Sequence, residues 1–64
     1  MELLIGKKCT GHPIGFREKI VGTILSIHEK TVVMEVNDFH ALDRETVIDK
    51  QNRVLCAKTH LFES

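Results

Sequence analysis

Short apolar runs separated by polar turns dominate the middle of the chain. Residues 19–36 have the sequence KIVGTILSIHEKTVVMEV, in which two segments rich in Ile, Val and Thr flank the polar residues 28–30. Runs of β-branched residues on either side of a polar triplet are typical of a β-hairpin. Apolar side chains occupy both alternating sets of positions in residues 20–27, so we expect this strand to be partly buried on both faces, as in a closed or nearly closed small barrel. Gly22 within it predicts a bulge or a sharp bend.

A second hairpin is predicted over residues 45–58, ETVIDKQNRVLCAK. Its two strands are residues 46–48 and residues 54–57, and the residues from Asp49 to Asn52 suit a tight turn built on side-chain hydrogen bonds. A helix is the weaker alternative, because no apolar stripe with a spacing of 3.6 residues persists for more than two turns.

Two further segments complete the predicted fold. Residues 3–6, LLIG, form the first strand, and residues 9–18, CTGHPIGFRE, form a long loop after it. Between the hairpins, residues 37–45, NDFHALDRE, form a turn or one helical turn. The caps expected for this turn are Asn37 or Asp38, and the side chains expected to face inward are Phe39 and Leu42.

Five short strands, a long first loop and a glycine early in the second strand resemble the SH3-like barrel, in particular its KOW-type version. The resemblance is carried by residues 5–8, IGKK, and by residues 21–36, VGTILSIHEKTVVMEV. In the second segment, the residues that stand where the pattern places them are Gly22, Ile24, Ile27 and Val33. The resemblance implies a small five-stranded all-β barrel, and the length of 64 residues predicts that residues 1–64 form one domain.

The stretch from Ile14 to Leu55 is also similar to a family of small Bacillus-type proteins represented by YkvS. The similar segments are IGFREKIVGTILSIHEKTVVMEV and NDFHALDRETVIDKQNRVL, and the similarity covers about two thirds of the chain. In the second segment an acidic residue, an aromatic residue, a leucine and a Thr-Val-Ile run recur in that order. No activity is assigned to that family, so the resemblance implies no particular activity for this chain.

The charge pattern and the N-terminal residues argue against a nucleic-acid-binding polycation, a secreted protein and a membrane protein. Nine Lys and Arg residues balance nine Asp and Glu residues, and no run of like charge is longer than Lys7–Lys8. This pattern argues against tight, sequence-independent binding of nucleic acid, which needs several phosphate neutralisations. The N-terminal residues MELLIGKK have only three consecutive apolar residues and resemble neither a secretory signal nor a membrane span. We therefore expect a cytoplasmic protein with no membrane partner.

Two Cys–His pairs, one near each end of the chain, are the candidate metal ligands. Cys9 and His12 have the spacing C-x2-H, and Cys56 and His60 have the spacing C-x3-H. Structural zinc takes four such ligands, and the first and last strands of a small barrel can be neighbours. The alternative is a chain without a cofactor, in which both cysteines are reduced, buried thiols. The alternation of Cys56 with Val54 favours that alternative.

A cluster of basic residues with one aromatic ring is the candidate binding site. We expect Phe16, Arg17 and Lys19 in the long loop to face Lys50 and Arg53 at the tip of the second hairpin. Small barrels that bind single-stranded nucleic acid combine a basic groove with several exposed aromatic rings. This chain has three Phe and no Tyr or Trp, so the alternative is that the charges are solvated and the rings fill the core.

The sequence contains no catalytic motif that we recognise. A Gly-rich phosphate loop, a nucleophile elbow and an HExxH pair are all absent, so we interpret the chain as non-enzymatic and infer no small-molecule substrate. His28 and His40 are expected in solvated turns. The favoured function is a protein–protein interaction adaptor or regulator, with self-association as one form of it. A KOW-like module associated with RNA or DNA is the alternative.

Leu61 and Phe62, close to the C-terminus, need a cover in either case. We expect them to fold back onto the barrel or to become buried in a second subunit.

Overall fold

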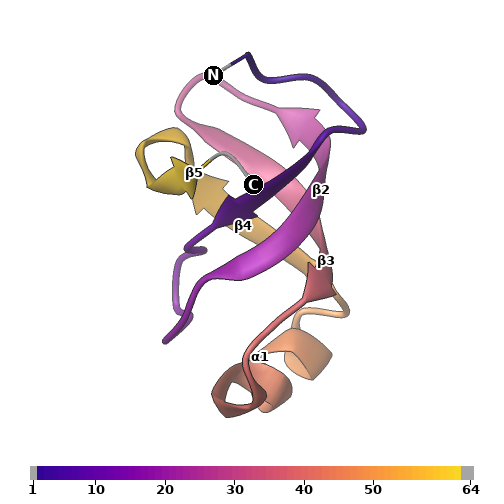
Figure 1. Ribbon diagram of the computed structural model, residues 1–64, viewed down its shortest axis with the longest axis vertical. Coiled ribbons are helices and arrows are strands. Elements are labelled where there is room, and N and C mark those ends of the chain that lie inside the picture. The colour runs from indigo at the N-terminus through magenta and orange to yellow at the C-terminus, as the bar shows by residue number, and fades with distance from the viewer. Residues whose placement is uncertain (1, 63–64) are drawn as a thin grey trace.

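Five antiparallel strands form a single, strongly curved sheet in the computed structural model, which describes residues 2–62 (Figure 1). Their order across the sheet is β4-β3-β2-β1-β5. The strands are β1 (Lys8–Gly11), β2 (Ile20–Ile27), β3 (Thr31–Asp38), β4 (Arg53–Ala57) and β5 (Leu61–Phe62). The helical elements are the 3-10 turn η1 (Ala41–Asp43), the helix α1 (Arg44–Asp49) and the 3-10 turn η2 (Lys58–His60). The predicted fold class, a small five-stranded all-β barrel of the SH3-like type with a long first loop, is confirmed.

The sheet curls around the core without closing, because the edge strands β4 and β5 do not pair with each other. Backbone hydrogen bonds bridge the opening. The Ile14 N–H donates to the carbonyl of Leu55 in β4 at 3.2 Å, and the His12 N–H donates to the carbonyl of His60 at 3.0 Å. Leu61 pairs with Gly11 and is buried on the barrel, as one of the two alternatives predicted, whereas Phe62 pairs with Thr10 and keeps 40% of its surface exposed. No helix within residues 2–62 has the length and apolar character needed to cross a membrane.

The β2–β3 hairpin is the largest part of the sheet, and the sequence predicts it correctly. The strands are joined by residues 28–30, and the His28 N–H donates to the Thr31 carbonyl at 2.8 Å. The register slips twice, between Val21 and Gly22 and again between Ile24 and Ser26. The first slip confirms the bulge predicted at Gly22. A Cβ atom at that position would lie 2.7 Å from the Glu35 carbonyl oxygen, so only glycine allows β3 to approach this closely.

The predicted first strand at residues 3–6 is wrong. The strand β1 begins at Lys8, and the preceding residues form a turn in which Gly6 has a φ of 90°. Two apolar residues of the predicted strand, Leu4 and Ile5, are exposed. The inward-facing residues of β1 are instead Cys9 and Gly11, whose small size carries no strong hydrophobic signal. Gly11 has little room for a side chain, because a Cβ atom at this position would lie 3.1 Å from the sulfur of Cys56, across the core.

The predicted second hairpin is wrong in its first half. Residues 46–48 belong to the six-residue helix α1, in which Val47 is buried and Ile48 is exposed. A helix this short has no room for a periodic apolar stripe, so the pattern that would have identified it is absent. The second half, β4, is confirmed, but the turn before it is formed by residues 50–52, because Asp49 is the last residue of α1. Gln51 and Asn52 adopt left-handed backbone angles there, with φ of 55° and 64°.

The segment between the hairpins also differs from the prediction. His40 caps η1 in place of Asn37 or Asp38, because its Nδ1 accepts the Leu42 N–H at 3.1 Å. Leu42 is exposed and Phe39 is only partly covered. The side chain that points inward from this turn is a carboxylate, Asp43, with 1% of its surface exposed.

Candidate functional site

The connection between β1 and β2, residues 12–19, is called the first loop here, and a buried carboxylate holds it in place. Both oxygens of Asp43 accept backbone hydrogen bonds from this loop, one from Arg17 N–H and one from Glu18 N–H, each at 2.9 Å. Within residues 2–62, Asp43 is the one charged side chain that is buried. Asp43 therefore connects η1 to Glu18 and Arg17, which lie 25 and 26 residues earlier in the chain.

These contacts also determine the charge of Asp43. The hydrogen bond from the Arg17 backbone lowers the pKa of the carboxyl group below its ordinary value of 3.8, and the bond from Glu18 acts in the same direction. Burial opposes this effect, and the positive charge of Arg17 adds to it. The carboxylate therefore stays ionised at neutral pH, and the ionised form is the one that accepts both N–H groups.

Other contacts fix the remainder of the first loop. The His12 ring lies with Nε2 at 2.8 Å from the Phe16 carbonyl oxygen. Because a carbonyl only accepts, Nε2 carries the proton in this contact. The Phe16 N–H donates to the Pro13 carbonyl at 3.2 Å, and Gly15 supplies a φ of 86° that few other residues adopt. The loop is thus held by the protein at its start, its middle and its end.

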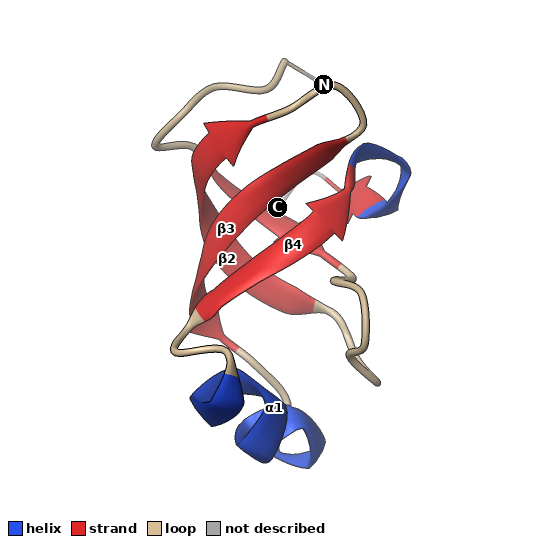
Figure 2. Cartoon of the chain, turned by 180° about the vertical axis from the view of Figure 1, so that it is seen from behind, coloured by secondary structure: helices blue, strands red, loops and turns tan. Residues whose placement is uncertain are grey.

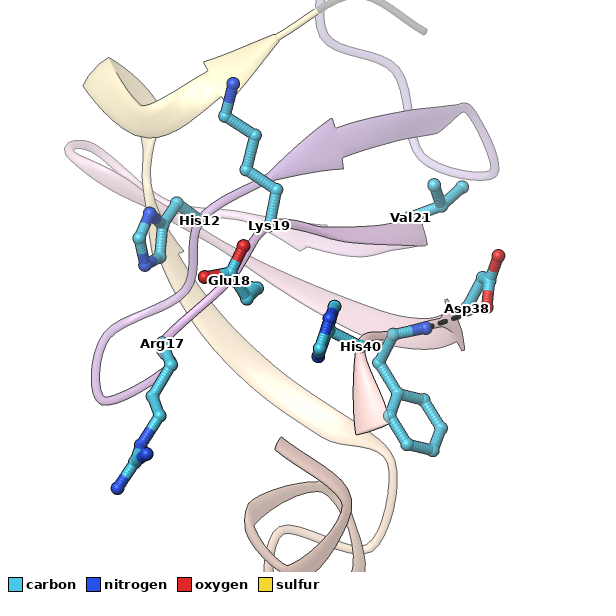
Figure 3. A pocket seen from close by; sticks show the side chains of 8 residues that line it. His12, Arg17, Glu18, Lys19, Val21, Asp38 and His40 are labelled. Carbon is cyan, nitrogen blue, oxygen red and sulfur yellow. Dashed lines mark hydrogen bonds between the residues drawn. The ribbon is translucent and has the colours of Figure 1, made fainter. Parts of the chain in front are cut away.

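A first groove of about 590 Å³ lies between the first loop and the end of β3 (Figure 3). Its lining residues are His12, Arg17, Glu18, Lys19, Val21, Asp38, Phe39 and His40. Two lining residues carry a fixed positive charge and two carry a negative charge, so the fixed charges cancel. Figure 3 shows the side chains of Arg17 and Lys19 extending in opposite directions from the loop, so they do not converge on one anion.

A second groove of about 390 Å³ lies between the first loop and the residues of η2 and β5. It is lined by His12, Pro13, Ile14, Gly15, Phe16, His60 and Phe62, and it shares His12 with the first groove. The Lys19 ammonium lies 4.4 Å from the centre of the Phe62 ring, which ties the start of β2 to β5 through a cation–π contact.

The structure brings together some of the predicted binding residues and separates others. Arg17 and Lys19 line the first groove, whereas Phe16 is buried in the core and lines the second. Lys50 caps the C-terminal end of α1, and Arg53 begins β4; both are exposed, and neither lines a groove. Sequence reasoning missed the residues contributed by the end of β3, above all Phe39 and His40. Their position directly after a predicted strand could have identified them as candidates, because binding residues are often found in loops at the ends of strands.

Two of the four candidate metal ligands have hydrogen-bond partners within the protein, His12 through its Nε2 and Cys56 through its sulfur, and His60 is exposed. Cys9 lies in β1 rather than on the predicted turn, and both it and Cys56 are fully buried and free. The Cys56 sulfur lies 3.5 Å from the Ala57 carbonyl oxygen and 3.6 Å from that of His60. Across residues 2–62, no three His, Cys, Asp or Glu side chains are grouped so as to hold a metal ion. The zinc hypothesis stays a prediction, and backbone pairing of β1 with β5 brings the two ends together.

Comparisons with protein-family models, curated proteins and solved structures find no match to this chain. The similarity to the YkvS-like family therefore stays a prediction.

The Asp43 contacts predict how stability changes with pH. The stability that this carboxylate contributes is present above its ordinary value of 3.8 and is lost as the pH falls through the lower pKa of the folded state. Asp43→Asn presents an NH₂ group to one of the two N–H donors. We expect urea unfolding midpoints to be clearly lower for this variant at pH 6, and the difference from the wild type to disappear in strong acid.

Asp49→Asn is the matched control, because it removes one exposed acid at the end of α1. It should change the midpoint little at either pH. A difference between the wild type and Asp43→Asn that is the same at both pH values would show that the ionised carboxylate does not hold the loop.

The two cysteines predict low thiol reactivity. Burial raises the pKa of both thiols, and for Cys9 the nearby charge of Lys7 only partly offsets this effect. We expect iodoacetamide at pH 7.5 to alkylate both residues slowly in the native protein and rapidly in urea, as followed by mass spectrometry. Fast alkylation of the native protein would contradict the burial of the two thiols. A native mass heavier by one zinc, together with a lower melting temperature after chelation, would instead establish the metal site.

Proposed function

We propose that this chain is a small, non-enzymatic binding module that recognises a segment of another protein in the first groove. The observation that carries the proposal is the composition of that groove. It combines apolar surface from Val21 and Phe39 with fixed charges of both signs, and its wall is a loop anchored to the rest of the fold. Polar groups held on a rigid scaffold beside apolar surface can orient a peptide at a low cost in conformational entropy.

The charges favour a protein segment over nucleic acid. Glu18 and Asp38 line the same groove as Arg17 and Lys19, so a chain of phosphates would meet repulsion as well as attraction. The other two predicted cations, Lys50 and Arg53, lie outside the groove. Of the three phenylalanines, Phe16 is buried, which leaves Phe39 and Phe62 as rings accessible for stacking on bases.

We also propose a cytoplasmic location. Both cysteines are free thiols within the fold, and free thiols persist in a reducing compartment.

A matched pair of variants tests the groove. Phe39→Ala removes an aromatic side chain from the groove, whereas Ile48→Ala removes an exposed side chain of α1 that lines neither groove. Tagged wild type and variants would be cross-linked in the source cell, and the captured proteins and cross-linked residues identified by mass spectrometry. We expect Phe39→Ala to reduce capture of the specific partner about tenfold or more, because buried aromatic anchors dominate such interfaces. Ile48→Ala should leave the capture unchanged.

Cross-links that map outside the first groove, or equal losses in the two variants, would contradict the proposal. A mobility shift of mixed RNA and DNA oligonucleotides that weakens with salt would replace it with the KOW-like nucleic-acid alternative. We expect no such shift at low salt.

A further inference from the structure

The outward face of β3 and β4 is self-complementary in its register. Alternate residues of β3 and β4 point away from the core, and three cross-strand pairs lie on this face: Thr31 with Ala57, Val33 with Leu55, and Glu35 with Arg53. The first two pairs are uncharged and the third joins an acid to a base. We propose that two copies of this chain associate through this face, which we call the outer face, about a two-fold axis that runs parallel to the strands.

The axis follows from the pairing. A two-fold rotation about a line parallel to the strands, between β3 and β4, places β3 of one copy over β4 of its partner at the same height. Val33 then meets Leu55 of the second copy, and Leu55 meets Val33. At the next level, Glu35 meets Arg53, and Arg53 meets Glu35. Every contact therefore occurs twice, and each charge faces the opposite charge.

The burial pattern shows that apolar side chains at the centre of the outer face are not covered by the rest of the chain. The inward residues of the two strands, Val32, Met34, Val54 and Cys56, are all buried. On the outward side, Leu55 has 45% of its surface exposed. Leu25 has 37% exposed, and it lies at the second register slip, between Ile24 and Ser26. Figure 2 shows β3 and β4 side by side on the near side of the molecule, with α1 below them rather than over them.

The outer face is separate from the grooves. None of its residues lines the first or the second groove, so this association leaves the proposed peptide site available in both copies. The face is formed by few side chains, so we expect the contact to bury less than the ~800 Å² per partner of a typical stable interface. We therefore expect a weak dimer with a Kd on the order of 100 µM.

Reversing the charge of Glu35 or Arg53 tests whether these residues contact each other between two copies or only within one chain. Glu35→Arg places two positive residues on the face, and Arg53→Glu places two negative residues on it. Each variant alone should dimerise at least about tenfold more weakly than the wild type, because like charges then face each other across the axis. When the two variants are mixed, each positive residue faces a negative one, and a heterodimer should form.

Sedimentation velocity between about 10 µM and 1 mM measures association, and native mass spectrometry with one variant labelled with ¹⁵N identifies the heterodimer. Thermal melts confirm that each variant is folded, since like charges opposite each other in one chain also reduce its stability. The double variant, Glu35→Arg with Arg53→Glu, should dimerise like the wild type. A wild type that stays monomeric at 1 mM, or a mixture of single variants that stays monomeric, overturns the proposal. Loss of groove binding in Phe39→Ala has no bearing on this result.

Discussion

The contact between the Asp43 carboxylate and the backbone of the first loop is the constraint on which the candidate site depends. The sheet is open between β4 and β5, so the loop that crosses this region is not held by strand pairing along its length. Asp43 supplies two charge-assisted hydrogen bonds, to Arg17 and Glu18, at the point where the loop turns toward β2. The same residues then line the first groove. Without the carboxylate, two N–H groups would lose their acceptor and the groove would lose a fixed wall.

The parts of the fold that sequence reasoning predicts are those with strong hydrophobic periodicity. Residues 20–27 and 31–38 are rich in β-branched residues, and the hairpin that they form has the predicted tip. The strand β1 was missed because its buried residues are a cysteine and a glycine, which carry no strong hydrophobic signal, and the close approach of Cys56 leaves little room for a side chain at Gly11. The helix α1 was missed because six residues show no periodic stripe.

The site was less predictable than the fold, for a different physical reason. Arg17, Lys19 and the importance of the first loop could be proposed from residue type, but Asp43 acts on backbone groups far away in the sequence, and backbone groups carry no sequence signal. Lys50 follows α1 and Arg53 begins β4, and neither lines the groove, which residue type alone could not show. One small sheet thus supports a charged groove at one end and an exposed face with paired charges on β3 and β4.

Amide hydrogen exchange, followed residue by residue by NMR at pH 6, tests the role of Asp43 most directly. In the wild type, the amide protons of Arg17 and Glu18 should exchange slowly although both side chains are exposed. In Asp43→Ala these two amides should exchange about tenfold faster or more, while Ile24 and Met34 in the β2–β3 hairpin keep their protection. Unchanged protection of Arg17 and Glu18 in this variant would contradict the account, because something other than the carboxylate would then hold the loop.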